Sequence, residues 1–313
     1  PSRLVGSEMC IRDSLVAGIA ILVLTDLWLV GKRYLNNRDF VDASHFERRF
    51  PFSLADKSIL EKATPHDRVL DLTTSIFQDA KPGYFHNSIG GNHGAKLRRY
   101  QDVIDGYLND KIKLLKAGRR DVAIPVLNML DTRFFKTGYG ENDYLHNITS
   151  LGFAWFPQEI VWAKNADEEF AMLDSLQGAQ TVILHEQFRS YMNGFRQQPL
   201  RYGKVELLEY LPGKVIYRTV CDSEQVIVFS EMWHKGNKHW EVKIDGQPST
   251  HVRANYLLRA MWVPAGEHII SFDYRPQPYY LGEKIAKAGS VFWLLLLLVI
   301  PIFINLKRFS AQN

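Results

Sequence analysis

One loop, together with the segment that follows it, carries the residue types that bind anions. Residues 84–105 read YFHNSIGGNHGAKLRRYQDVID, a glycine-bearing loop that runs into a basic segment. Backbone N–H groups at a helix N-terminus favour negative charge, and nearby cations add to that preference. The pattern predicts a site for the phosphate of a sugar phosphate or a lipid diphosphate at His86, Gly90, Gly91, His93, Lys96, Arg98 and Arg99.

The same stretch also has a purely structural interpretation. The glycines would form a tight turn and the basic residues a solvated helix face, because Arg98 and Asp102 have the spacing of a helical ion pair. The loop matches neither a P-loop nor a dinucleotide fingerprint. His86 and His93 have no carboxylate or thiolate near them in the loop, which argues against a metal site. The sequence therefore predicts no metal and no cofactor.

Signatures of catalysis are not found along the chain. The sequence has no G-x-S-x-G elbow, no H-E-x-x-H motif and no Asp-x-Asp pair of the kind used by nucleotide-sugar enzymes. Asp167, Glu168 and Glu169 are spaced like a paired-acid site. They also fall in the first turn of a predicted helix, where the helix dipole favours carboxylates, and this favours a structural role. No catalytic residue is assigned.

Aromatic residues in the C-terminal half suggest a second kind of binding. Aromatic rings exposed on a β-sandwich would stack on sugar rings, and aromatic residues in strands also commonly form the core. Both interpretations remain open at this point. The candidate glycan-binding residues are Trp233, Trp240, Tyr256 and Arg259.

The elements that must position these residues alternate in the first half of the chain. Apolar residues recur at helical spacing from Leu97 to Leu115, which predicts one amphipathic helix over 95–116 that ends before Gly118. An Asn165 cap with Glu168 three residues on predicts a helix to about Leu176. Together with strands expected at 67–73, 133–136 and 181–185 and a short helix at 125–130, this pattern predicts an extracytoplasmic α/β domain at 32–200.

The second half reads as short strands separated by turn residues. Leu211-Pro212-Gly213, Asp245-Gly246 and Pro264-Ala265-Gly266 carry turn chemistry between the runs. This pattern predicts a β-sandwich at 201–278 and the α+β class for the chain between its ends. The expected strands are 204–210, 214–220, 225–230, 240–244, 256–263 and 268–274.

Both ends of the chain are apolar. Leu15–Val30 has Asp26 as its single charge, and Val291–Ile304 has none before Lys307-Arg308. These runs predict transmembrane helices at 15–31 and 286–305, although a buried core helix is the alternative for each. The closing Lys307-Arg308 predicts a cytoplasmic tail at 306–313, which would place everything between the two spans outside the cytoplasm.

Composition narrows the class of protein. The chain has 313 residues, 46% hydrophobic residues and a formal net charge of +4, which fits a folded protein and gives no concentrated basic face for nucleic acid. Two cysteines, Cys10 and Cys221, provide no disulfide framework. Residues 1–14 have neither periodicity nor a signal-peptide design, so we expect them to be a non-native leader.

Several short runs, collinear over almost all of the chain after residue 15, resemble the YfhO-type bacterial membrane proteins, especially the large ones of Bacteroidetes. The runs are DLW and KRYLN at 26–36, SIGG and AKLRRYQD at 88–102, LNML at 127–130, FSE at 229–231, IDG at 244–246, RANYLLRA at 253–260, VPAGEH at 263–268 and YYLGEK at 279–284.

The resemblance implies a polytopic inner-membrane protein with the architecture of GT-C glycosyltransferases, enzymes that take a sugar from a polyprenyl-phosphate carrier to modify envelope glycans. The implied partners are the lipid bilayer, the lipid-linked sugar and an envelope glycan. In GT-C enzymes the catalytic acid lies in an early extracytoplasmic loop, which is not among these residues. We therefore expect a C-terminal fragment that is inactive alone.

Two other functional readings stay open. One is a non-catalytic envelope protein whose outer domain binds glycan or a partner protein. The other is a small two-span sensor or scaffold.

Overall fold

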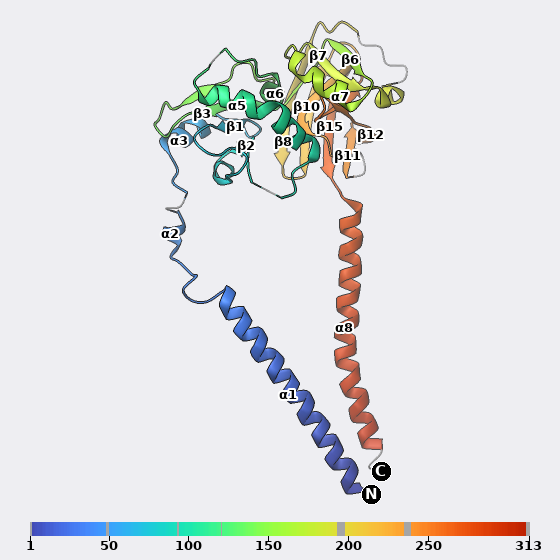
Figure 1. Ribbon diagram of the computed structural model, residues 1–313. Helices are drawn as coiled ribbons and strands as arrows, with labels where there is room; N and C mark the ends of the chain where they lie inside the picture. The colour runs from blue at the N-terminus through green and yellow to red at the C-terminus, as the bar shows by residue number, and fades with distance from the viewer. Residues whose placement is uncertain are drawn as a thin grey trace. The chain divides into compact units, whose positions relative to one another are not determined.

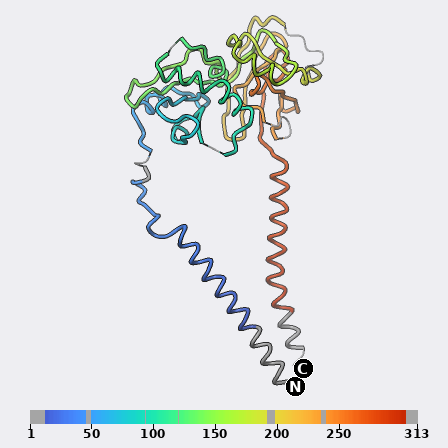
Figure 2. Tube along the Cα trace, in the orientation of Figure 1, coloured from blue at the N-terminus to red at the C-terminus, as the bar shows by residue number. Residues whose placement is uncertain are grey.

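The computed structural model describes residues 2–47, 50–92, 94–119, 121–192, 198–234 and 239–310. The chain divides into two units, 1–52 and 53–313, which are considered separately. Figure 2 traces the path of the chain from end to end.

The first unit consists of helix α1 (Ser2–Tyr34) and the short helix α2 (Ala43–Glu47). The stretch Asp13–Tyr34 of α1 has a mean hydropathy of 2.1, and none of its apolar window is buried. By length and composition it can cross a membrane. Helix α1 includes residues that the sequence assigned to a leader, since it begins at Ser2.

The second unit begins with a small mixed sheet of order β2-β1-β3-β4. Strand β1 (Arg68–Asp71) pairs in parallel with β2 (Asn87–Ser88) and β3 (Thr132–Lys136), and β4 (Tyr144–His146) pairs antiparallel with β3. Helix α3 (Leu54–Leu60) precedes it. Ser53 and Asp56 form a capping box at the start of α3, which satisfies backbone N–H groups that the helix leaves free.

The predicted helix over 95–116 is shorter and less regular than the periodicity indicates. Leu97 has extended backbone angles, so α4 begins at Arg98 and runs to Val103. One π-helical turn (Ile104–Leu108) follows, and α5 (Asn109–Lys116) completes the segment. Its apolar face packs with helix α6 (Pro125–Met129) and the small sheet in one core that includes Leu70, Val103, Ile104, Leu108, Ile112, Val126 and Phe135.

A six-stranded mixed sheet crosses the predicted boundary at residue 200. Its order is β5-β10-β14-β13-β7-β6. Strands β5 (Ala154–Trp155), β6 (Glu159–Ala163) and β7 (Thr181–His185) come from before the boundary. They join β10 (Gln225–Met232), β13 (Val252–Ala254) and β14 (Leu258–Val263) from after it. Helix α7 (Ala166–Ala171) connects β6 to β7 and continues as a 3₁₀ turn to Ser175, as its Asn165 cap predicts.

A five-stranded antiparallel sheet completes the β-rich region, with the order β12-β11-β15-β9-β8. Its strands are β8 (Gly203–Leu211), β9 (Lys214–Cys221), β11 (Trp240–Ile244), β12 (Gln247–Ser249) and β15 (Gly266–Tyr274). Alternate residues of the two larger sheets share a second core, made of Val215, Tyr217, Ile227, Phe229, Val242, Met261, Val263, Ile270 and Phe272. Figure 1 shows strands of the two sheets lying against each other.

Helix α8 (Gln277–Ser310) follows β15 directly. Its stretch Gln277–Phe303 has a mean hydropathy of 2.2, and its apolar window is also unburied. The predicted α+β class, the β-rich C-terminal region and the apolar helices at both ends are thus confirmed. The strand predicted at 256–263 is too long, because Asn255 and Tyr256 have φ values of 47° and 65° and form a turn between β13 and β14.

Candidate functional site

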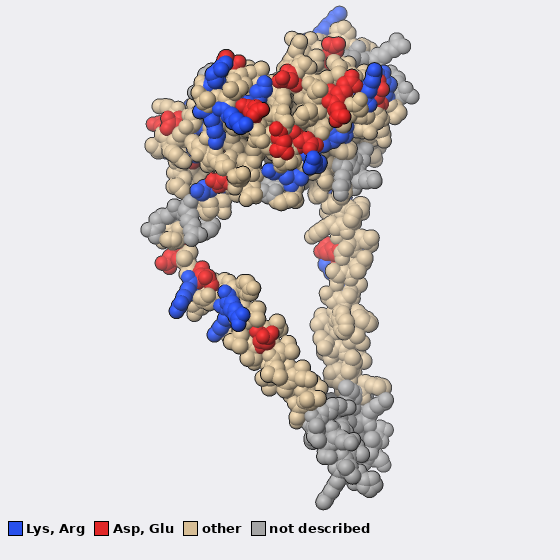
Figure 3. All heavy atoms as spheres, in the orientation of Figure 1, with Lys and Arg blue, Asp and Glu red and all other residues tan. Residues whose placement is uncertain are grey.

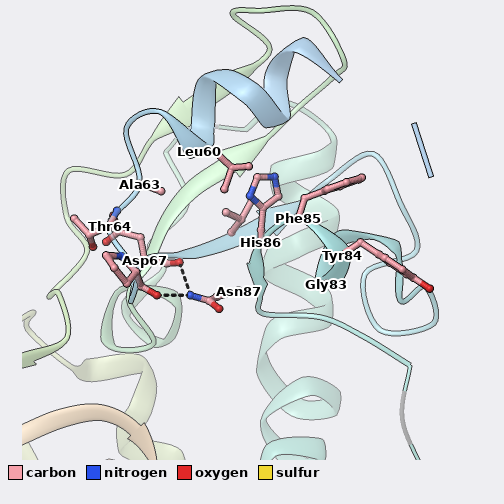
Figure 4. Close-up of a pocket in the computed structure, with 11 residues that line it drawn as sticks. Leu60, Ala63, Thr64, Asp67, Gly83, Tyr84, Phe85, His86 and Asn87 are labelled. Carbon is pink, nitrogen blue, oxygen red and sulfur yellow. Dashed lines mark hydrogen bonds between the residues drawn. The ribbon is translucent and has the colours of Figure 1, made fainter. Parts of the chain in front are cut away.

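A pocket of about 410 Å³ lies between the turn after α3 and the chain segment that leads into β2. The first wall comes from Leu60 and Ala63 to Pro65, and the second from Gly83 to Asn87. Asp67 and Val69 of the β1 region complete it. Figure 4 shows His86 between Leu60 and Phe85, with Asn87 facing the turn that carries Thr64 and Asp67. The pocket therefore combines aromatic, amide, imidazole and carboxylate groups.

An ionised carboxylate holds the imidazole of His86 in place. His86 Nε2 lies 2.8 Å from Asp56 Oδ1, and Lys136 Nζ donates to the same oxygen at 2.7 Å. Burial alone would raise the pKa of Asp56, but hydrogen bonds from His86, Lys136 and Ser53 outweigh burial and lower that pKa. Because Asp56 belongs to the capping box of α3, the orientation of His86 is tied to the start of that helix.

The opposite rim is fixed by side-chain contacts to the backbone. Asn87 Nδ2 donates to the Pro65 carbonyl at 2.7 Å, and the Thr64 N–H donates to Asp67 Oδ2 at 2.7 Å. Tyr84 is 55% exposed on the second wall. A few fixed polar groups beside aromatic surface suit a ligand rich in hydroxyl groups. The pocket-lining residues place no Ser or Cys nucleophile beside His86.

The residues predicted to bind an anion turn toward different partners. Gly91 donates its N–H to the Ile76 carbonyl at 2.8 Å, and the Gly90 N–H donates to Ser88 Oγ at 3.1 Å. Lys96 lies over the Phe77 ring. His86 belongs to the pocket, and His93 lies outside the described residues. Anion binding at this loop stays a prediction.

Arg98 and Arg99 separate at the start of α4. Arg98 is 89% exposed and pairs with Asp102 at 3.0 Å, as the structural interpretation expects. Arg99 stacks on the Tyr256 ring, 4.3 Å from its centroid, and its guanidinium lies 3.7 Å from Glu169. Burial, and then the neighbouring Arg253, lower the pKa of Arg99.

Glu169, one of the three predicted first-turn acids, is fully buried. Its carboxylate accepts from Arg253 Nη2 at 2.9 Å and from the Tyr256 N–H at 2.9 Å. The Tyr256 hydroxyl in turn donates to Asp102 at 3.0 Å. Two of the sequence runs that carry the family resemblance, AKLRRYQD and RANYLLRA, therefore meet in one buried cluster, which is an architectural role.

Two of the four predicted glycan-binding residues are buried in the β-rich region, and the two tryptophans are half-buried. Tyr256 is 8% exposed and Arg259 is 3% exposed. Arg259 stacks on Trp240 at 3.8 Å and donates from Nε to the Met232 carbonyl at 3.0 Å. Trp233 is half-buried and lies against Phe188 and Arg253. Tyr256 and Trp233 adjoin Arg253, whereas Trp240 and Arg259 form a separate stack, so the four do not share one surface. Glycan binding through these residues stays a prediction.

A second buried charge cluster was not predicted from the sequence. His66 is fully buried, with Nδ1 2.8 Å from Asp131 and Nε2 3.0 Å from Glu231. Arg68 donates to Glu231 at 3.0 Å and to the Ser230 carbonyl at 2.8 Å. The cluster joins the small sheet to β10. Its members are up to 165 positions apart, so the one local signal was FSE at 229–231 within the resemblance.

Electrostatic coupling within this cluster is strong. Burial alone would raise the pKa of Glu231, but the hydrogen bond from His66 and the charge of Arg68 outweigh burial and hold the pKa at about 2. Among the described residues, no group of three or more His, Cys, Asp or Glu is arranged to hold a metal ion. The cluster thus combines the Arg68–Glu231 ion pair with a histidine that is hydrogen-bonded to two carboxylates, at a seam between sheets.

Comparisons with family models, with curated proteins and with solved structures found no match for this chain.

Proposed function

We propose that this chain is part of a polytopic bacterial inner-membrane protein, held by α1 and α8, whose α+β domain lies on the extracytoplasmic side. The observation that carries the proposal is the exposure of both apolar helices, for example 71% at Leu22 and 68% at Leu297. Apolar surface of that extent is unfavourable in water, and each helix is long enough for a hydrocarbon core of about 30 Å.

Within that protein we assign the α+β domain a supporting role in envelope glycan modification. The resemblance to enzymes that use polyprenyl-phosphate-linked sugars supports this assignment. The pocket around His86 and Asn87 supplies the surface that would hold a glycan acceptor. Asp56, Glu169 and Glu231 are engaged by internal partners, which favours positioning over chemistry for the domain.

Membrane insertion is tested by extracting cell membranes that contain the full chain with alkaline carbonate. An integral protein is expected to remain in the pellet and to dissolve only in detergent. Release into the carbonate supernatant would contradict the proposal.

Glycan binding is tested on the full chain in detergent micelles with an array of envelope glycans. The variants Tyr84→Ala and Asn87→Ala remove groups of the pocket. We expect each to weaken binding by about tenfold, the cost of one well-placed contact. Tyr202→Ala, at a residue that is 56% exposed and does not line the pocket, is the matched control. Equal binding by all three variants would move the glycan site elsewhere.

The non-catalytic alternative, an envelope protein that binds glycan or a partner, differs in one outcome. Turnover of a polyprenyl-phosphate sugar by the complete protein in vesicles would contradict it.

A further inference from the structure

The C-terminal end of α1 carries a pocket that the proposed function does not use. It has a volume of about 920 Å³ and lies within the first unit. Its apolar part is Leu27, Trp28 and Leu35, at the end of the apolar run. Its polar part is Lys32 and the turn Asn36–Arg38. The pocket thus changes from apolar to basic at the level where a membrane span ends.

The turn that closes the pocket is fixed by local hydrogen bonds. The Asn36 N–H donates to Asp39 Oδ2 at 2.8 Å, and the Arg38 N–H donates to Asn36 Oδ1 at 2.9 Å. Asp39 is the carboxylate nearest to the turn in the chain, and it is already engaged as an acceptor. The turn therefore fixes the backbone at Arg38, beside Asp39 and a few residues after Lys32 and Arg33.

The cations here lack ion-pair partners. Among the residues that the structure describes, Lys32, Arg33 and Arg38 form no ion pair. Lys32 Nζ lies 5.3 Å from the centroid of the Trp28 ring, a contact that keeps the ammonium at the edge of the apolar surface. Figure 3 shows Lys and Arg side chains in blue at this end of α1, with acidic side chains in red beside them and a stretch without charged residues further along the helix.

The side of the membrane on which these cations lie follows from the proposed topology. The positive-inside rule places Lys307-Arg308, near the C-terminal end of α8, in the cytoplasm, and this puts the α+β domain outside. Applied to Lys32 and Arg33, the same rule would place the C-terminal end of α1 in the cytoplasm, which is the opposite side. Short basic tails obey the rule better than segments attached to large translocated domains, so the α8 assignment is the stronger one. The α1 cations then lie on the outer side, where an anionic headgroup is a partner of complementary charge.

We infer that this pocket binds the headgroup phosphate of an anionic phospholipid in the outer leaflet. Leu27, Trp28 and Leu35 would contact the upper acyl chain, and Lys32 and Arg38 of the pocket lining would contact the phosphate, with Arg33 adding positive charge next to Lys32 in the chain. Trp at this depth is typical of a membrane interface, and basic residues beside it attract anionic headgroups. The inference rests on the membrane placement proposed above.

The test compares the full chain with a triple variant, Lys32→Gln, Arg33→Gln and Arg38→Gln, in vesicles of phosphatidylcholine with or without phosphatidylglycerol. Lipid that stays bound after solubilisation is measured by native mass spectrometry. The control variant, Lys57→Gln, Lys113→Gln and Arg119→Gln, removes the same charge from exposed sites that have acidic partners.

We expect the triple variant to retain on the order of a hundredfold less phosphatidylglycerol, since each cation near a surface contributes about fivefold. The control is expected to match the unaltered chain. The inference would be overturned if the unaltered chain, the triple variant and the control variant retained equal amounts of phosphatidylglycerol. It would also be overturned if the unaltered chain retained as much phosphatidylcholine as phosphatidylglycerol.

Vesicle flotation separates this inference from the proposed function. A chain that floats with vesicles but does not distinguish the two lipids refutes the lipid site alone. A chain that floats with neither vesicle refutes the membrane placement, and the lipid site with it.

Discussion

Charged side chains are enclosed by partners in the α+β domain but exposed at the end of α1. In the domain, Glu169 and Glu231 are enclosed by arginine, histidine and backbone donors. At the end of α1, Lys32, Arg33 and Arg38 are exposed and form no ion pair among the described residues. Enclosed charges of this kind specify how sheets and helices fit together, whereas unpaired cations at the end of an apolar helix are available to another molecule.

The contrast changes how the family-like runs are understood. AKLRRYQD and RANYLLRA meet at Glu169, because Arg99 lies 3.7 Å from its carboxylate, Arg253 Nη2 donates to it at 2.9 Å, and the Tyr256 hydroxyl donates to Asp102. What makes these two runs distinctive is therefore their role in holding the fold together. Two surfaces outside this cluster that could bind another molecule are the His86 pocket and the end of α1.

The largest effect is expected for Glu169→Ala. The substitution leaves the Arg253 guanidinium, 5% exposed, without its carboxylate, and removal of one partner from a buried pair costs about 3–5 kcal/mol. Urea unfolding of the full chain in micelles, followed by tryptophan fluorescence, measures the loss. Asp167→Ala, in the same helical turn but exposed, is the control and should change stability by less than about 0.5 kcal/mol. Similar losses of stability in both variants would contradict the larger contribution assigned to the buried carboxylate.

The second effect is a loss of stability in acid. The folded-state pKa of Glu231 is about 2, below its ordinary value of 4.5, so its stabilisation is fully present above about pH 4.5. It is lost as the pH falls toward 2, and the shift corresponds to about 3 kcal/mol. Glu231→Gln should be less stable at neutral pH and should lose less stability over that interval. Parallel pH profiles for the two proteins would contradict the coupling to His66 and Arg68.

A smaller effect is expected for Gly90→Ala in the predicted anion loop. A Cβ at Gly90 would lie 2.0 Å from the Ile76 carbonyl oxygen, a backbone atom that cannot move away cheaply. Overpacking of this kind costs about 1–3 kcal/mol. Gly94→Ala is the control in the same loop, because its Cβ would meet nothing within 4 Å. Equal unfolding midpoints would show that the loop can rearrange around Gly90.

The smallest effect is expected for Arg98→Gln. Arg98 is 89% exposed, and an exposed pair on a helix contributes about 0.3–0.5 kcal/mol. Arg99→Gln should cost more, because Arg99 stacks on Tyr256 and faces buried Glu169. If the two variants unfolded at the same urea concentration, the division of this pair into a surface and an interior residue would be incorrect.

The sequence predicted the local elements well because periodicity and turn residues are local signals. The Asn165 cap, strand β1 and the hairpins of the five-stranded sheet lie close to their predicted places. What it missed depends on contacts between distant residues. Nothing local indicates that β7 pairs with β13, or that a π-helical turn interrupts the helix after Val103.

The site was less predictable than the fold, for the same reason. The spacing of the residues placed His86 and Arg99 in one loop-helix motif. In the structure His86 is hydrogen-bonded to Asp56, which lies earlier in the chain, and Arg99 pairs with Glu169, which lies later. Aromatic content alone did not separate rings on the surface from Trp240 and Tyr256 in the interior, because burial depends on how the sheets pack. The unpredicted His66 cluster required strands from both halves of the chain.

The most direct test of the account is the side of the membrane on which the domain lies. A Cys10→Ser background keeps Cys221, which is buried and should react only after denaturation. Asp110, whose side chain is 83% exposed, is replaced by Cys, and intact cells are treated with a membrane-impermeant maleimide. The account predicts labelling of Asp110→Cys in intact cells. Labelling only after the inner membrane is broken would place the domain in the cytoplasm and contradict it.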